Sequence, residues 1–152
     1  VSALSSELMK DFGLDVTGQA LDLANRLDIL NNDILQTVSA VPAENRKLVT
    51  GHESMGYFAA RYGFKLVGVI IPGLTTQAET SAADLAALKK AIADNKVKVI
   101  FTELGTSAAV ADSIGSETGV QVVRLSTHVL RPDGSYFTFM RNVATTVTGA
   151  LK

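Results

Sequence analysis

Apolar residues recur at helical spacing near the start of the chain. Between Val16 and Val38 the apolar positions are three or four residues apart, which places them on one helix face: Ala20, Leu23, Leu27, Leu30, Ile34 and Val38. Asp15 is placed to cap this helix, and Pro42 to stop the chain soon after it. At 1.5 Å per residue the helix measures about 33 Å, so it either reaches beyond the domain as a strut or covers it. A second amphipathic helix is expected upstream, over residues 1–12.

From Lys47 onward the pattern changes to short runs rich in valine and isoleucine that alternate with helical stretches. The expected strands are 47–50, 65–71, 97–102 and 120–125, and the expected helices are 53–62, 81–95, 107–118 and 135–151. Runs of this composition are typical of strands that are buried on both faces. Repeated strand–helix–strand order indicates parallel pairing with right-handed crossovers. The predicted fold is therefore α/β: a four-stranded parallel sheet flanked by helices and preceded by the long helix.

Composition narrows the range of functions. Lysine and arginine total 14 and aspartate and glutamate total 15, and a net charge of −1 argues against a nucleic-acid binder. The absence of cysteine excludes disulfides, thiolate metal sites and cysteine nucleophiles. No apolar run approaches the roughly 20 residues that a membrane-spanning helix needs. The sequence also contains no nucleophile elbow, phosphate-binding glycine loop or dinucleotide fingerprint, so no enzymatic activity is expected.

Candidate functional residues follow the expected strands. In an open parallel sheet ligands bind beyond the carboxyl ends of the strands. His52 follows the first strand, Glu103 the third and His128 the fourth. A carboxylate directly after an apolar strand is costly to bury unless it is paired or bound to a cation. Imidazole and carboxylate donors suit zinc or manganese, and the same pair could act as a base with its orienting partner.

The residues around His52 resemble a known motif. The stretch 46–64, RKLVTGHESMGYFAARYGF, is similar to the central motif of the zinc- and manganese-binding receptors of ABC transporters, some of which are lipoprotein adhesins. The segment 97–103, VKVIFTE, is similar to the second motif of that family, and 135–143 resembles its last helix. The resemblance extends over nearly all 152 residues.

The resemblance implies a two-lobed receptor with its metal between the lobes. Residues 1–44 would form a helical segment that includes the long bridging helix, and 45–152 the C-terminal α/β lobe. His52 and Glu103 correspond to ligands, and the place of the family's aspartate falls at Ser126 or Thr127, beside His128. His128 is therefore the third candidate ligand, and its imidazole would favour zinc. The N-terminal lobe, with a further ligand histidine, is expected outside this chain, which leaves the site incomplete.

The function implied by the resemblance is capture of zinc or manganese outside the cytoplasm for import by an ABC permease. The expected location is the periplasm, or the cell exterior as a membrane-anchored protein. Because the apolar face of the long helix would lose its cover without the other lobe, a homodimer through that face is also expected.

Two other functions remain open at this point. A small α/β enzyme would use His52 and Glu103 as an acid–base pair, and an intact nucleophile motif would favour it. A receptor lobe that has lost its metal would serve as an interaction or adhesion module, and the missing aspartate supports that alternative.

Overall fold

The computed structural model describes residues 1–71, 81–127, 130 and 132–152. Its centre is a four-stranded sheet in the order β2-β1-β3-β4, in which every neighbouring pair is parallel. The strands are β1 (Lys47–Thr50), β2 (Lys65–Val69), β3 (Val99–Thr102) and β4 (Gln121–Arg124). The predicted four-stranded parallel α/β fold is therefore confirmed.

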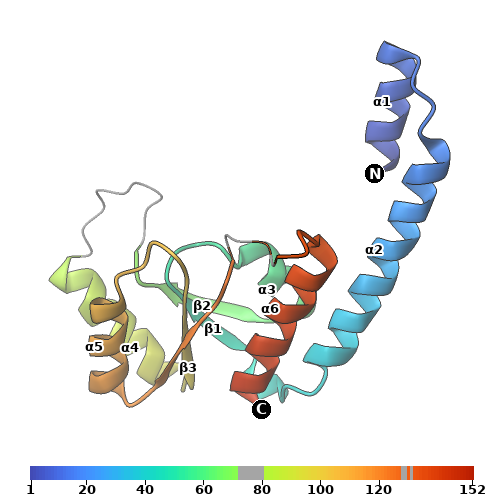
Figure 1. Cartoon of the computed structure of the whole chain (residues 1–152). Helices are drawn as coiled ribbons and strands as arrows, with labels where there is room; N and C mark the ends of the chain where they lie inside the picture. The colour runs from blue at the N-terminus through green and yellow to red at the C-terminus, as the bar shows by residue number, and fades with distance from the viewer. Residues whose placement is uncertain (72–80, 128–129, 131) are drawn as a thin grey trace.

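Helices cover both faces of this sheet (Figure 1). The helices are α1 (Ser2–Phe12), α2 (Thr17–Val38), the short 3₁₀ helix η1 (Ala43–Asn45), α3 (Gly56–Tyr62), α4 (Ala82–Asp94), α5 (Ala108–Thr118) and α6 (Tyr136–Leu151). Helices α4 and α5 lie on one face, and α2, α3 and α6 lie on the other. None of the helices in the described part of the chain is both long and apolar enough to cross a membrane.

The strands divide their side chains between two apolar cores. Along β1, Leu48 packs with α2, α3 and α6, whereas its neighbour Val49 packs with α4 and α5. Along β3, Phe101 faces the first core and Ile100 the second, and both are fully buried. This alternation follows from the two-residue period of a strand. It explains why neighbouring residues in the two central strands, Leu48 and Val49 in β1 and Ile100 and Phe101 in β3, are all apolar.

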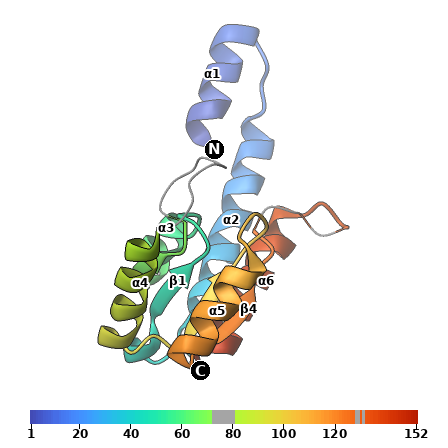
Figure 2. The same ribbon diagram turned by 90° about the vertical axis from the view of Figure 1, so that its left-hand side faces the viewer.

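Helix α2 belongs to the α/β body at one end and leaves it at the other (Figure 2). Leu30, Ile34 and Val38 in its C-terminal half are buried against the sheet side that carries α6. Its N-terminal half extends away from the body, and α1 folds back along it. The Asp33 carboxylate on α2 accepts a hydrogen bond of 2.7 Å from the Arg141 guanidinium on α6. The helix is therefore a strut whose base is part of the core.

Several element boundaries differ from the sequence-based prediction. The N-cap position of α2 is Val16, although the Asp15 carboxylate does accept a hydrogen bond of 3.0 Å from the Thr17 amide. Helix α3 begins at Gly56 instead of residue 53. Residues 52–55 form a turn instead, because their polar groups bond to one another and to the strand ends. The consequence is that His52 lies in a turn rather than at the first position of a helix.

Candidate metal centre

His52 and Glu103 come together at the carboxyl edge of the sheet. His52 lies two residues after β1 and Glu103 directly after β3, and these two strands are neighbours. The His52 Nδ1 atom lies 3.2 Å from Glu103 Oε2. Two of the three candidate ligands predicted from the sequence therefore lie side by side.

The Glu103 carboxylate is enclosed by hydrogen-bond donors. Its side chain has 0% of its surface exposed. Oε1 accepts a hydrogen bond of 2.6 Å from the Ser54 hydroxyl, and Oε2 accepts one of 3.1 Å from the Gly51 amide. His52 Nδ1 is the third group within reach. These donors replace the hydrogen bonds to water that the carboxylate loses on burial.

The turn after β1 fixes the position of His52 through its backbone. The His52 carbonyl accepts a hydrogen bond of 2.7 Å from the Thr50 hydroxyl and another of 2.8 Å from the Ser54 amide. The imidazole keeps 22% of its surface exposed, in contrast to its fully covered carboxylate partner. The histidine is therefore the member of the pair that a solute can approach.

The pair has two chemical possibilities. Two donor atoms on one tetrahedral zinc ion, each about 2.0–2.2 Å from the metal, are separated by about 3.3–3.6 Å, slightly more than the observed 3.2 Å. A carboxylate can instead accept the Nδ1–H of an imidazole and orient it, so that the lone pair lies on Nε2. The burial of Glu103 and the donors on both of its oxygens favour the second arrangement.

The third candidate, His128, lies outside the described residues, as does its neighbour at position 129. Ser126 and Thr127, at the place of the family's aspartate, follow β4 at the same edge of the sheet. Ser126 and Glu103 line one shallow depression between the β3–α5 loop and the end of β4. Within the described ranges no group of three or more histidine, aspartate, glutamate or cysteine side chains is placed to hold a metal ion. The described residues therefore bring together two candidate ligands at this edge, His52 and Glu103.

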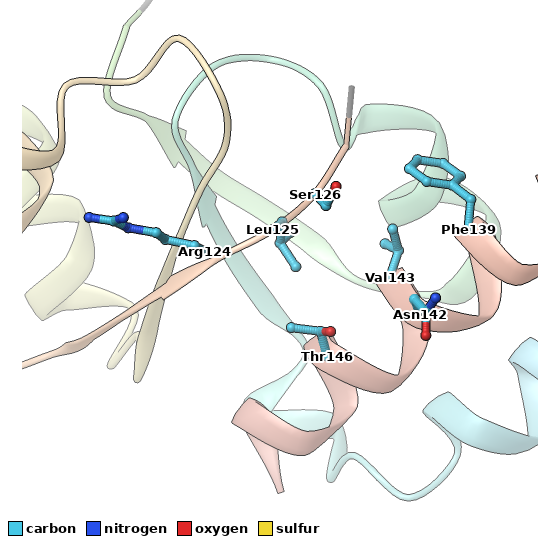
Figure 3. Close-up of a pocket in the computed structure, with 7 residues that line it drawn as sticks. All are labelled: Arg124, Leu125, Ser126, Phe139, Asn142, Val143 and Thr146. Carbon is cyan, nitrogen blue, oxygen red and sulfur yellow. The ribbon is translucent and has the colours of Figure 1, made fainter. Parts of the chain in front are cut away.

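A second pocket lies between the end of β4 and α6 (Figure 3). Its labelled lining residues are Arg124, Leu125, Ser126, Phe139, Asn142, Val143 and Thr146. None of these is a histidine or an acid, and the Arg124 side chain extends away from α6. This pocket therefore contains neither the imidazole nor the carboxylate donors that are typical of zinc sites.

Sequence reasoning did not identify the residues that hold the pair in place. Gly51 and Ser54 contribute the donors to Glu103, and Thr106 packs its hydroxyl against Gly51. All three are small residues in turns and loops, a composition that turn formation alone would explain. These residues could have been suspected from the position of Glu103, because a carboxylate that follows a buried strand needs hydrogen-bond donors close by.

The model of the family described as "ZnuA: Zinc-uptake complex component A periplasmic" matches residues 6–150, and the chain belongs to this family. The family resemblance drawn from the motifs is thereby confirmed.

Individual relatives are similar over part of their length. The high-affinity zinc uptake system protein ZnuA of Bacillus subtilis is 41% identical over 95 residues, which cover 62% of this chain and 29% of that protein. The periplasmic zinc-binding protein TroA of Treponema pallidum superposes with a TM-score of 0.78 at 26% identity, over 99% of this chain and 58% of TroA. The laminin-binding protein Lmb of Streptococcus agalactiae, described as an adhesin with metal-transporting activity, gives 0.79 at 25% identity, over 97% and 58%. The chain thus spans less than two thirds of these relatives.

Proposed function

We propose that this chain is the C-terminal part of a receptor that captures a divalent transition metal outside the cytoplasm and delivers it to an ABC permease. The observation that carries the proposal is the His52–Glu103 pair at the carboxyl edge of the sheet, in a chain of the zinc-uptake family. The relatives are binding and transport proteins, and one is named for zinc uptake. The proposed location is the periplasm or, for a membrane-anchored form, the outer face of the cell.

The proposed organisation has residues 1–44 as the bridging segment and 45–152 as the C-terminal lobe. A second lobe, outside this chain, would supply the remaining ligands. Support comes from the exposed apolar side chains in the segment that leaves the body, among them Phe12 and Leu21. Large exposed apolar patches are typical of surfaces that another element covers. A homodimer through the same face is the alternative outcome.

We infer separate roles for the two paired residues. His52 is the metal ligand through Nε2, and Glu103 orients it by accepting the Nδ1–H. This differs from the initial expectation that both are ligands, and the burial of Glu103 supports the change. His128, Ser126 and Thr127 remain the candidates for a further ligand from this chain.

Zinc is the preferred metal in this proposal, with manganese second. Imidazole nitrogen is a common zinc ligand, whereas manganese favours carboxylate, carbonyl and water oxygen. A site whose exposed donor is the His52 imidazole, with the carboxylate turned to a supporting role, therefore favours zinc.

The deciding experiment is calorimetric titration of the full-length product of the gene with zinc and with manganese. We expect zinc to bind more tightly than manganese, with a melting temperature that rises as zinc is added, because binding to the folded state alone stabilises it. The isolated 152-residue chain should bind much more weakly, since its ligand set is incomplete. Absence of binding of either metal by the full-length protein would refute the proposal.

Exchange of Glu103 for glutamine tests its role. If Glu103 orients His52, Glu103→Gln should lower zinc affinity by about 10- to 100-fold, the range for loss of a supporting partner. The zinc-bound crystal structure of the wild-type protein should then show no carboxylate oxygen of Glu103 at the 2.0–2.2 Å typical of zinc coordination. An oxygen of Glu103 at that distance would make it a ligand and contradict the assigned role.

A further inference from the structure

Two small residues close to His52 in the chain, Gly51 and Ser54, both contact the buried Glu103 carboxylate. A Cβ atom built on Gly51 would lie 2.5 Å from Glu103 Oε2 and would overlap the Thr106 hydroxyl. Real Cβ atoms do not approach other heavy atoms so closely, so a side chain at position 51 must displace one of these groups. Because Gly51 has no side chain, the Glu103 carboxylate can approach the end of β1.

Ser54 holds the other side of the same carboxylate. Its hydroxyl lies 2.6 Å from Glu103 Oε1, and its amide donates to the His52 carbonyl at 2.8 Å. One residue therefore fixes both members of the pair, the histidine through its backbone and the glutamate through its side chain. Hydrogen bonds to an ionised group are shorter and stronger than those between neutral groups.

We propose that Gly51 and Ser54 are positioning residues for metal capture, and that they act on His52 through Glu103. Gly51 provides the space and one donor for Oε2, and Ser54 provides the donor for Oε1. Together they fix the carboxylate where it accepts the Nδ1–H of His52 and aims Nε2 outward. The inference rests on the proposed function, because it assigns these residues to the zinc site described above.

The test compares the variants Gly51→Ala, Ser54→Ala and Ser54→Thr in the full-length protein. We expect Gly51→Ala and Ser54→Ala to lower zinc affinity by about 10- to 100-fold, and Ser54→Thr, which retains the hydroxyl, to remain near the wild-type value. The matched control is Gly68→Ala in β2, whose Cβ would meet Leu88 Cδ1 at 2.7 Å and no atom of the pair within 4 Å. Gly68→Ala should lower the melting temperature and leave zinc affinity unchanged.

A double variant distinguishes the displacement of Glu103 from a steric clash with Thr106 alone. Thr106→Ala removes the hydroxyl that overlaps the new Cβ, but the conflict with Glu103 Oε2 remains. Gly51→Ala/Thr106→Ala should therefore regain part of the melting temperature that Gly51→Ala loses while its zinc affinity stays low. Recovery of both quantities together would overturn the proposal. If Gly51→Ala does not fold, the comparison of Ser54→Ala with Ser54→Thr decides.

A second readout does not need the metal. The Nδ1–H proton of His52, held by a buried carboxylate, should give a protected resonance in nitrogen-15 spectra of the metal-free protein. Gly51→Ala and Ser54→Ala should lose it, and Ser54→Thr should keep it. If the wild-type protein binds no zinc, the proposed function fails, and this resonance alone then decides whether the two residues position His52. Unchanged resonance and unchanged affinity in both variants would refute the inference.

Discussion

Replacement of His52 by alanine should lower the zinc affinity of the full-length protein more than a hundredfold. Structural zinc sites with four ligands are worth about 10–16 kcal/mol in zinc-finger peptides, so one ligand corresponds to roughly 3 kcal/mol. His52 is the exposed member of the pair, with 22% of its side chain accessible beside a fully buried partner. Calorimetric titration of wild type and His52→Ala measures the difference directly.

The matched control for this variant is Glu53→Ala in the same turn. Glu53 is exposed, and its replacement should change zinc affinity little. If His52 only packs against its neighbours, His52→Ala would instead lower the melting temperature and leave zinc affinity unchanged. That result would end the ligand role of His52 and remove the main support for a metal site at this edge.

The sheet was predictable because its two central strands, β1 and β3, are buried on both faces. Neighbouring apolar residues in these strands belong alternately to the two cores of the structure. In the segments between the strands, apolar residues recur at helical spacing and glycines follow the expected helix ends. The resulting alternation of strands and helices predicts a parallel sheet. The ends of the elements were less predictable, since polar turn residues such as Ser54 can either begin a helix or precede one.

The meeting of His52 and Glu103 at one edge of the sheet was also predictable, whereas the role of each residue was not. Strand order places the residues after β1 and β3 at one edge, and this brings His52 and Glu103 together. Whether a carboxylate there binds a metal or orients a histidine depends on its donors. Those donors come from Gly51 and Ser54. The lack of a side chain at Gly51 and the hydroxyl of Ser54 can be interpreted only when the position of the Glu103 carboxylate is known.

Replacement of Ile34 by alanine should destabilise the chain by about 2–5 kcal/mol, the usual cost of removing a large buried aliphatic side chain. Ile34 lies in the C-terminal half of α2, has 1% of its surface exposed and belongs to the core shared with α6. A loss of this size is a large part of the 5–15 kcal/mol that stabilises a typical domain. Urea unfolding of the 152-residue chain, followed by circular dichroism, measures it.

Leu21→Ala in the same helix is the control, because Leu21 is 62% exposed and lies in the half that leaves the α/β body. Its replacement should change the free energy of unfolding by no more than about 0.5 kcal/mol, since exposed positions contribute little to stability. Together the two variants show which part of α2 folds with the α/β body. Equal effects of Ile34→Ala and Leu21→Ala would show that α2 is independent of the sheet, and a boundary at residue 44 would then separate two folding units. A large loss for Ile34→Ala alone would show that the C-terminal half of α2 folds together with the core that it shares with α6.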